Sequence, residues 1–385
     1  MSLNLKHRNK HQTMNLAIQS PGKSTYSETF IRCQITCLKP ELQIFGGPVA
    51  SETIPGGPIN PKKSLLGLCE ISLEMLIRNK TFGAVQAREL RRRLKKHKIS
   101  TILANFGPSG VALLPVIQGT HIKLVVHFHG YDAHKDQMLS EFREDYIRLG
   151  KACHRIIVVS DKMKKALIKI GIPEKKVILL RYGVDPRVFL PQSRRSNEQI
   201  FFSVGRFVDK KAPYLTLLAF TQVLIEYPKC KLVLAGDGEL LEATKNMAIA
   251  LGMQKSVEFP GVLQPQQIAS HMRKALCYVQ HSLVPEVGPN RGDSEGTPVA
   301  ILEALMTGIP VISTRHAGIT DVVVEGKSGY LVKERDVKGM AKAMKLMCAQ
   351  PEKAKEMGLY ARKDAMEKYT LEKYILGLKE ILHSA

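Results

Sequence analysis

Short apolar runs alternate along the first half of the chain with longer stretches in which apolar residues recur at helical spacing. The short runs have the length and β-branched content of strands, and the longer ones have the period of amphipathic helices. This alternation is typical of a parallel sheet with helices on both faces. The predicted strands are residues 14–18, 42–45, 101–104, 123–127, 155–159 and 177–180, and the predicted helices include 27–38, 82–97 and 161–170.

The pattern breaks at residues 186–197, which contain two prolines, two serines and a basic pair, and then resumes. Such a composition is typical of a linker, and 385 residues are more than one compact core usually serves. We therefore predict an α/β protein of two Rossmann-like doubly wound domains, 1–190 and 191–367, facing across a cleft, with a C-terminal helix at 368–385 packing back on the first domain. The second set of predicted strands is 199–204, 230–235, 256–259, 276–279 and 309–313.

Composition narrows the class of protein. Hydrophobic residues make up 44% and charged residues 24%, which excludes a disordered chain, and the longest apolar stretch is interrupted by polar residues and prolines. The seven cysteines are an odd number without paired spacing, which predicts reduced thiols and a cytoplasmic protein.

The positive charge is concentrated in one half of the chain. The net charge is +22; residues 1–190 hold 31 Lys and Arg against 14 Asp and Glu, and residues 191–385 hold 26 against 21. The first half is thus expected to meet something anionic: nucleic acid, an anionic membrane face or a phosphate-bearing lipid.

Most candidate functional residues lie in loops that follow predicted strands, where open α/β sheets bind ligands. A glycine-containing turn at residues 292–297 leads into an apolar helix, so its backbone N–H groups predict an anion site. Glu303, in the middle of that helix, must be hydrogen-bonded or paired, and the two hydroxyls of a sugar diol suit its two oxygens. The alternative is a capping role for Glu295 and an internal salt bridge for Glu303.

Glu295-Gly296-Thr297-Pro298 and Glu303-Ala304-Leu305, followed by Gly-Ile-Pro-Val, resemble the signature of retaining glycosyltransferases of family 4, which have the two-Rossmann GT-B fold. Segments 315–319 and 326–332 fall where that family has further donor-side loops. The run at 27–31 resembles the subgroup that works on polysaccharides and lipopolysaccharides. The resemblance covers nearly the whole chain.

The segment that begins at Gly205 resembles the family's Gly-Arg motif, with Arg206 and, five residues later, Lys211. Two cations at a strand end suit a nucleoside diphosphate as negative charge builds on its β-phosphate. Taken alone, they are more often a solvated surface. The family usually has glycine after the lysine, and Ala212 stands here instead, so a slightly different backbone is expected.

Two further loops match the family. His129, in a loop after a predicted strand, resembles the family's catalytic histidine, although a histidine in such a place is ordinarily a surface residue. By resemblance it hydrogen-bonds the donor sugar from the opposite domain. Residues 235–239, which include Gly236, resemble the turn near the base pocket.

The predicted helix at residues 87–98 is strongly basic. It is either a solvated face or a patch that meets anionic headgroups, as in several family members that dock on membranes. The expected protein is therefore cytoplasmic, with a peripheral position on the inner face of the membrane as an option.

By resemblance the enzyme transfers a sugar, most often from a uridine diphosphate donor, to a hydroxyl of a glycan, a lipid-linked or a small-molecule acceptor. Arg206 and Lys211 take the diphosphate charge, Glu303 the ribose, and Glu295 with the Gly296 and Thr297 amides the sugar and phosphate. No cofactor and no metal are expected, since no Asp-x-Asp pair suits a divalent ion against a diphosphate. The alternatives are an epimerase or phosphorylase on the same scaffold, or a basic nucleic-acid binder, although no nucleic-acid partner is expected because no recognisable motif for one is present.

Overall fold

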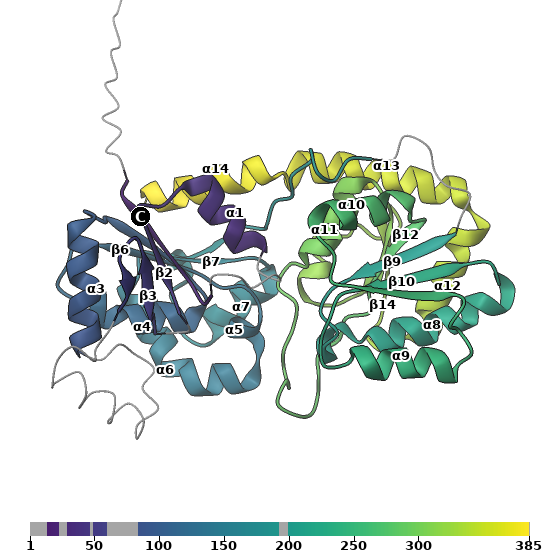
Figure 1. Cartoon of the computed structure of the whole chain (residues 1–385), viewed down its shortest axis with the longest axis horizontal. Coiled ribbons are helices and arrows are strands. Elements are labelled where there is room, and N and C mark those ends of the chain that lie inside the picture. Colours follow the sequence, from purple (N-terminus) through teal and green to yellow (C-terminus); the bar gives the residue numbers. More distant parts are fainter. Residues whose placement is uncertain (1–13, 23–28, 47–48, 60–83, 192–198, 385) are drawn as a thin grey trace, which may run out of the picture.

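The computed structural model describes residues 14–22, 29–46, 49–59, 84–191 and 199–384. They form two sheets that lie end to end, each covered by helices (Figure 1). The start of the helix predicted from residue 27 lies outside the described residues, as do residues 192–198 of the predicted linker.

The first sheet has the strand order β4-β3-β2-β1-β5-β6-β7-β8. All neighbours from β2 to β8 pair in parallel, and β3 and β4 add an antiparallel edge. Its strands are β1 (Leu16–Ser20), β2 (Leu42–Phe45), β3 (Glu52–Ile54), β4 (Gly57–Pro58), β5 (Thr101–Asn105), β6 (Lys123–His127), β7 (Arg155–Val158) and β8 (Val177–Leu179). Its helices are α1 (Thr29–Leu38), α3 (Ala84–Lys96), α4 (Gly107–Ile117), α5 (Tyr131–His134), α6 (Asp136–Ala152) and α7 (Asp161–Lys169).

The second sheet is parallel throughout, with the order β11-β10-β9-β12-β13-β14. Its strands are β9 (Ile200–Val204), β10 (Lys231–Ala235), β11 (Val257–Gly261), β12 (Cys277–Val279), β13 (Val311–Thr314) and β14 (Gly329–Val332). Its helices are α8 (Pro213–Glu226), α9 (Leu241–Ala250), α10 (Pro265–Lys274), α11 (Val299–Thr307), α12 (Val337–Ala349) and α13 (Pro351–Lys368). The predicted fold class, two doubly wound α/β sheets, is confirmed.

The sequence pattern missed three strands, β3, β4 and β14. β4 and β14 are edge strands, and β3 lies between β4 and β2. The β3–β4 hairpin turns through Gly56 and Gly57, both at positive φ, and its strands are too short for a hydrophobic alternation to be recognised. Residues 326–332 resemble a donor-side loop of the family, and the structure forms β14 within them. Gly329 fits there because a side chain would meet the carbonyl oxygen of Val311 at 2.0 Å on the neighbouring strand.

The last two helices join the two halves of the molecule. α13 packs on α11, and α14 (Leu371–Ser384) then runs along α1 of the first half (Figure 1). The crossing is fixed by two backbone hydrogen bonds, from the Val184 N–H to the Tyr369 carbonyl and from the Leu371 N–H to the Val184 carbonyl, both 2.9 Å. The C-terminal helix α14 therefore contacts the domain of the first sheet.

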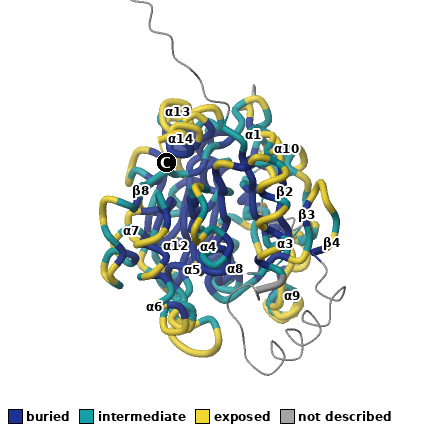
Figure 2. Tube along the Cα trace, turned by 90° about the vertical axis from the view of Figure 1, so that its left-hand side faces the viewer, coloured by how far each residue is buried: buried dark blue, intermediate teal, exposed yellow. Residues whose placement is uncertain are grey.

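Buried apolar side chains form two clusters, one around the first sheet and reaching beneath α11 and α14, the other between the second sheet and helices α8 and α12. Strands are buried and the outer helix faces are exposed (Figure 2). Among the described residues, none of the helices combines the length and hydropathy that crossing a bilayer requires.

Candidate functional site

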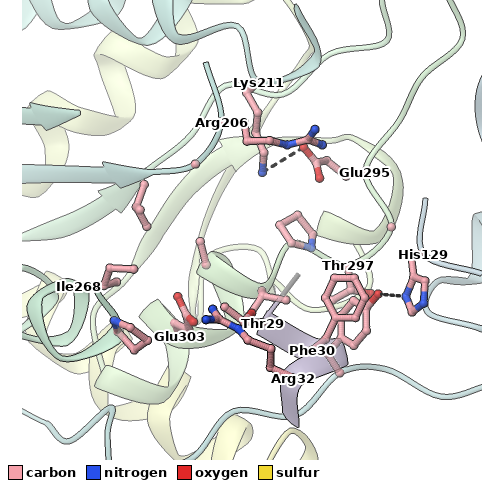
Figure 3. Close-up of a pocket in the computed structure, with 18 of the residues that line it drawn as sticks. Thr29, Phe30, Arg32, His129, Arg206, Lys211, Ile268, Glu295, Thr297 and Glu303 are labelled. Atoms are coloured by element: carbon pink, nitrogen blue, oxygen red, sulfur yellow. Dashed lines mark hydrogen bonds and ion pairs between the residues drawn. The ribbon is translucent and has the colours of Figure 1, made fainter. Parts of the chain in front are cut away.

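A cavity of about 320 Å³ lies where the two domains meet (Figure 3). Carboxyl ends of strands from both sheets and the N-terminal part of α1 contribute to its wall, as expected for a ligand site of facing α/β domains. The candidate residues that line it are His129, Arg206, Lys211, Glu295, Gly296, Thr297 and Glu303. The structure thus brings together residues from positions 129 to 303 of the chain.

The cations follow β9. Arg206 is exposed and, among the described residues, has no ion-pair partner. Lys211 ends a short 3₁₀ turn, and its ammonium lies 3.0 Å from a Glu295 carboxylate oxygen and 3.3 Å from the Gln280 side-chain oxygen. Burial lowers the pKa of Lys211, and the Glu295 carboxylate opposes that shift. This part of the wall therefore presents the Arg206 guanidinium, which has no ion-pair partner among the described residues, and the Lys211 ammonium, whose charge is paired with Glu295.

Glu295 is held in its ionised form. Burial by itself would raise its pKa, but the charges of Lys211 and Lys210 outweigh burial and lower the pKa to about 2. Lys210, whose side chain is 8% exposed, pairs with Asp293 at 3.1 Å. Two lysines therefore pair with two carboxylates of one loop, Lys211 with Glu295 and Lys210 with Asp293. The family motif marks only Lys211 of the two.

His316 fixes the loop that carries Glu295. Its Nε2 accepts a hydrogen bond from the Glu295 backbone N–H at 3.1 Å, so its Nδ1 carries the proton and donates to Glu334 at 2.7 Å. The Thr297 hydroxyl donates to the Val159 carbonyl across the domain boundary. Since that hydroxyl is used, Thr297 can offer a ligand its backbone amide, which is the group named from the sequence.

Glu303 has no charged partner among the described residues, so the alternative reading of an internal salt bridge is not supported. It lines the cavity from α11, and burial alone raises its pKa to about 7. A carboxyl group in this state is costly to ionise unless a ligand supplies hydrogen bonds. The site at Glu303 is therefore suited to a ligand with adjacent hydroxyl groups.

His129 faces the cavity from the first domain, but both of its ring nitrogens already have protein partners. Nδ1 lies 2.5 Å from the Tyr182 hydroxyl, and Nε2 lies 2.8 Å from the Asn105 side-chain oxygen. The Asn105 amide is oriented because its nitrogen donates to the Gln19 carbonyl at 2.9 Å. Nε2 is thus the protonated nitrogen, and burial, reinforced by His127, lowers the pKa of His129 well below its usual value. A direct imidazole bond to a sugar requires one of these partners to give way.

The loop around His129 is built by Asp132. One of its carboxylate oxygens accepts from the backbone N–H groups of His129 and Gly130, at 3.0 and 2.9 Å, and the other accepts from Gly107 at 3.0 Å. Burial raises the pKa of Asp132 to about 6, although these N–H groups oppose the shift. A fixed carboxylate therefore ties two loops of the first domain together.

Gly236 does not line the cavity. It has φ +130, and a side chain there would meet the carbonyl oxygen of Gly205 at 1.9 Å. The glycine lets β9 and β10 end side by side beneath Arg206. Its place in the structure is thus that of a packing residue next to the site.

Ala212, where the family usually has glycine, directly precedes α8. It has φ 35 and ψ 55 in the left-handed region, which a glycine would adopt at less cost. The alanine is therefore held in a glycine-like conformation at the start of α8.

Several lining residues were missed because nothing in a single sequence marks them: Phe30, Arg32, Phe106, Tyr131 and Tyr182. They come from segments far apart along the chain. Among the described residues no cluster of His, Cys, Asp or Glu could hold a metal ion.

Comparison with known proteins identifies the chain. Residues 71–188 match the family described as Glycosyltransferase Family 4, and residues 188–364 match Glycosyl transferases group 1. The chain belongs to these glycosyltransferases. The two matches are consecutive and meet at residue 188, so the lining residues from Phe106 to Glu303 lie within them, and those of α1 precede them.

Among the relatives of this glycosyltransferase is the amylovoran biosynthesis glycosyltransferase AmsK of Erwinia amylovora, 31% identical over 62% of this chain and 59% of AmsK. Another is a GDP-mannose-dependent phosphatidylinositol monomannoside mannosyltransferase of Mycolicibacterium smegmatis, 24% identical over 77% of this chain and 79% of the relative. The alignments with AmsK and two further curated relatives cover about three fifths of those proteins.

Solved structures share the fold. Anabaena HepE, in complex with UDP and glucose, superposes with a TM-score of 0.72 at 16% identity, over 97% of this chain and 100% of HepE. The sucrose-phosphate synthase of Thermosynechococcus elongatus gives 0.72 at 15% identity, over 96% and 98%. The predicted GT-B architecture is therefore confirmed.

Proposed function

We propose that the protein transfers a sugar from a nucleoside diphosphate sugar to a hydroxyl group of a growing polysaccharide or related glycan, with retention of configuration. The observation that carries this proposal is the arrangement of charge in the cavity. The guanidinium of Arg206 and the Lys211–Glu295 pair line the same cavity as Glu303, which has no charged partner in the described chain.

In this reaction Arg206 and Lys211 stabilise the charge that develops on the leaving diphosphate. Glu303 accepts hydrogen bonds from the two ribose hydroxyls, and Glu295 orients the sugar while holding Lys211 in place. The bond between the anomeric carbon and the diphosphate oxygen breaks, and the acceptor oxygen bonds to the same face of that carbon. The acceptor proton passes to the leaving phosphate, so no protein nucleophile and no metal take part.

His129 contributes from the opposite wall. With Nδ1 accepting from Tyr182 and Nε2 donating to Asn105, its ring is neutral and fixed in one tautomer. We assign it the role of shaping the sugar site, where closure of the two domains completes the reaction centre.

A uridine diphosphate sugar is the proposed donor class. The support is the family resemblance and the fold shared with HepE, whose structure holds UDP and glucose. The mannosyltransferase relative is named for a guanosine donor, so a test must include both bases.

The test measures thermal stabilisation by UDP, GDP and their sugar derivatives, followed by donor hydrolysis and transfer. A ligand that binds only the folded protein stabilises it by RT ln(1 + L/Kd), where L is the free ligand concentration, and therefore raises Tm. We expect stabilisation by one base, lost in Arg206→Ala and kept in Lys245→Ala, an exposed residue on α9 paired with Glu242. The absence of any nucleotide binding would contradict the proposal.

The basic helix α3 is the proposed contact with an anionic membrane. Two of its arginines have structural roles: Arg91 donates to the Val116 carbonyl at 2.7 Å, and Arg93 pairs with Glu89 at 2.8 Å. The exposed Lys95 and Lys96 remain for headgroups, each worth about 1 kcal/mol near such a surface.

This contact can be tested by flotation with vesicles of phosphatidylglycerol and phosphatidylcholine at low salt. Reversal of charge at Lys95 and Lys96 should abolish binding, and the same reversal at the exposed pair Lys338 and Lys342 on α12 should not. Equal loss in both variants would indicate that net charge alone is responsible, against a specific membrane face.

A further inference from the structure

Aromatic rings gather at the first-domain end of the cavity. Phe30 of α1 stacks on His129 with ring centroids 4.4 Å apart and on Tyr182 at 4.9 Å. Phe106 lies edge-on to His129 at 4.7 Å and 5.3 Å from Tyr131. The five rings come from four separate segments of the chain, and all of them line the same cavity.

Phe106 is held there in a strained conformation. Its φ of 74 lies in the left-handed region, which is unfavourable for a residue other than glycine. Its N–H is nevertheless bonded to the His127 carbonyl at 2.8 Å, and the side chain is only 6% exposed. The next residue, Gly107, has no room for a side chain, since a Cβ would meet the Phe128 ring at 2.4 Å. The fold therefore holds this ring at the cavity although the backbone conformation is unfavourable.

Tyr131 is the accessible member of the group. It begins α5 and is 36% exposed, against 4% for Tyr182. Just before it, Gly130 approaches the turn of the second domain, since a Cβ there would lie 3.3 Å from the Gly296 N–H. Tyr131 and the turn that carries Glu295 therefore line the same cavity.

We propose that Tyr131 and Phe106 form the platform on which a sugar ring of the acceptor stacks. This inference rests on the proposed function and names the acceptor class as a glycan. The axial C–H groups of a pyranose are slightly positive and fit the negative face of an aromatic ring. Its hydroxyl groups then face the polar turn at Glu295 and Gly296. The nucleotide end, at Glu303, lies on the other domain, so the acceptor sugar and the nucleotide occupy different walls of the cavity.

The chemistry of this end favours a sugar over an acyl chain. Tyr131 lines the same cavity as the polar Glu295 loop, and burying an acyl chain there would leave polar groups of that loop without partners. A sugar has both a C–H face and hydroxyl groups. A lipid-chain acceptor is the competing occupant in the test.

The first experiment separates donor handling from acceptor binding. The variants Tyr131→Ala and Tyr131→Phe are compared with wild type for nucleotide-induced stabilisation, donor hydrolysis and transfer to a panel of p-nitrophenyl glycosides and to dodecanol. For Tyr131→Ala we expect unchanged nucleotide stabilisation and hydrolysis, with KM for the glycoside raised about tenfold. Tyr131→Phe keeps the ring and should restore KM, which a general loss of folding would not do.

The second experiment uses the absence of tryptophan from the chain. Tyr131→Trp places a single indole on the platform, and Tyr360→Trp places one on α13, where Tyr360 lies under the Lys327 ammonium. Glycosides added with nucleotide should shift the emission of the first variant and leave the second unchanged.

The outcomes distinguish the two proposals. A wild-type protein that binds no nucleotide overturns the proposed function and the platform with it. Two results would overturn the platform and leave the proposed function standing, provided that the protein binds nucleotide and hydrolyses the donor. One is an unchanged glycoside KM in Tyr131→Ala, and the other is transfer to dodecanol alone.

Discussion

The two walls of the cavity differ in how their side chains are made compatible with burial. The second-domain wall is charged, with Arg206, the Lys211–Glu295 pair and Glu303, and its pKa values are displaced in opposite directions. The first-domain wall, around Phe106 and His129, is largely aromatic, and Arg32 of α1 adds a charged side chain to it. The charged wall needs ion pairs or a ligand to offset desolvation, and the aromatic wall needs only packing.

This difference indicates on which wall ligand binding should change the protein most. Groups that lack a partner, such as Glu303, gain one when a nucleotide binds, so the charged wall should respond to ligand and pH. The aromatic wall is complete without ligand, because both nitrogens of His129 already have partners. Variants on the charged wall should thus have the larger effects.

The largest effect is expected for Lys211→Ala. It removes a cation from the diphosphate and leaves the Glu295 carboxylate buried without its partner, so turnover should fall about 10²–10³-fold. Breaking a buried pair also costs about 3–5 kcal/mol of folding stability. Steady-state kinetics and urea unfolding measure the two effects. Lys211→Arg keeps the charge and should lose much less stability; an equal loss would mean that packing of the lysine stem matters more than its charge.

A pH-dependent effect is expected at Glu303. Burial raises its pKa to about 7, so the carboxylate is mostly ionised only above that pH. Since ribose hydroxyls donate more strongly to a charged oxygen, nucleotide affinity should rise about tenfold as pH passes upward through 7, and Glu303→Gln should remove the rise. Isothermal titration calorimetry from pH 6 to 8 checks this.

The same shift predicts the stability of the ligand-free protein. The folded pKa lies above the unfolded one, so the stabilising contribution is complete below the unfolded pKa and is lost as pH rises through about 7. Glu303→Gln should therefore raise Tm at pH 8 and have little effect at pH 4. A variant less stable than wild type at pH 8 would show that the carboxylate has a favourable partner.

A smaller effect is expected on the aromatic wall from Tyr182→Phe. It removes the hydroxyl that donates to Nδ1 of His129 while keeping the ring. The free energy of unfolding should fall by about 1 kcal/mol, and turnover should fall less than tenfold. Nitrogen-15 NMR should detect the Nε2-protonated tautomer in wild type and a mixture in the variant. A single tautomer in both would assign the control of His129 to Asn105 alone.

The smallest effect is expected where the walls are tied together at the surface. Arg291 of the second domain pairs with Asp136 of the first at 2.8 Å, but both side chains are more than half exposed. Arg291→Ala should cost at most about 1 kcal/mol. Arg187→Ala breaks an exposed pair within one segment and is the matched control. A larger loss of stability or turnover in Arg291→Ala would mean that this tie controls closure.

Much of the fold could be predicted because parallel strands buried on both faces leave a strong apolar signal. The predicted strands 42–45 and 123–127 are the observed β2 and β6, and the others differ by one or two residues at one or both ends. The short strands β3 and β4 could not be predicted, since strands of two or three residues need no continuous apolar run. Arg206, Lys211, Glu295 and Glu303 were named because they stand in recognisable local motifs.

The sequence by itself determined two doubly wound domains, a basic first half and the polar loops that follow the strands of the second. Three features depend on the tertiary structure. Lys210 pairs with Asp293 and, with Lys211, lowers the pKa of Glu295. Gly236 packs beneath the site, and His129 is held between Asn105 and Tyr182. These facts depend on distances between segments that lie far apart along the chain. Local propensity acts over a few residues, and the packing that joins Phe30, Phe106 and Tyr131 in one wall exists only once both sheets have formed.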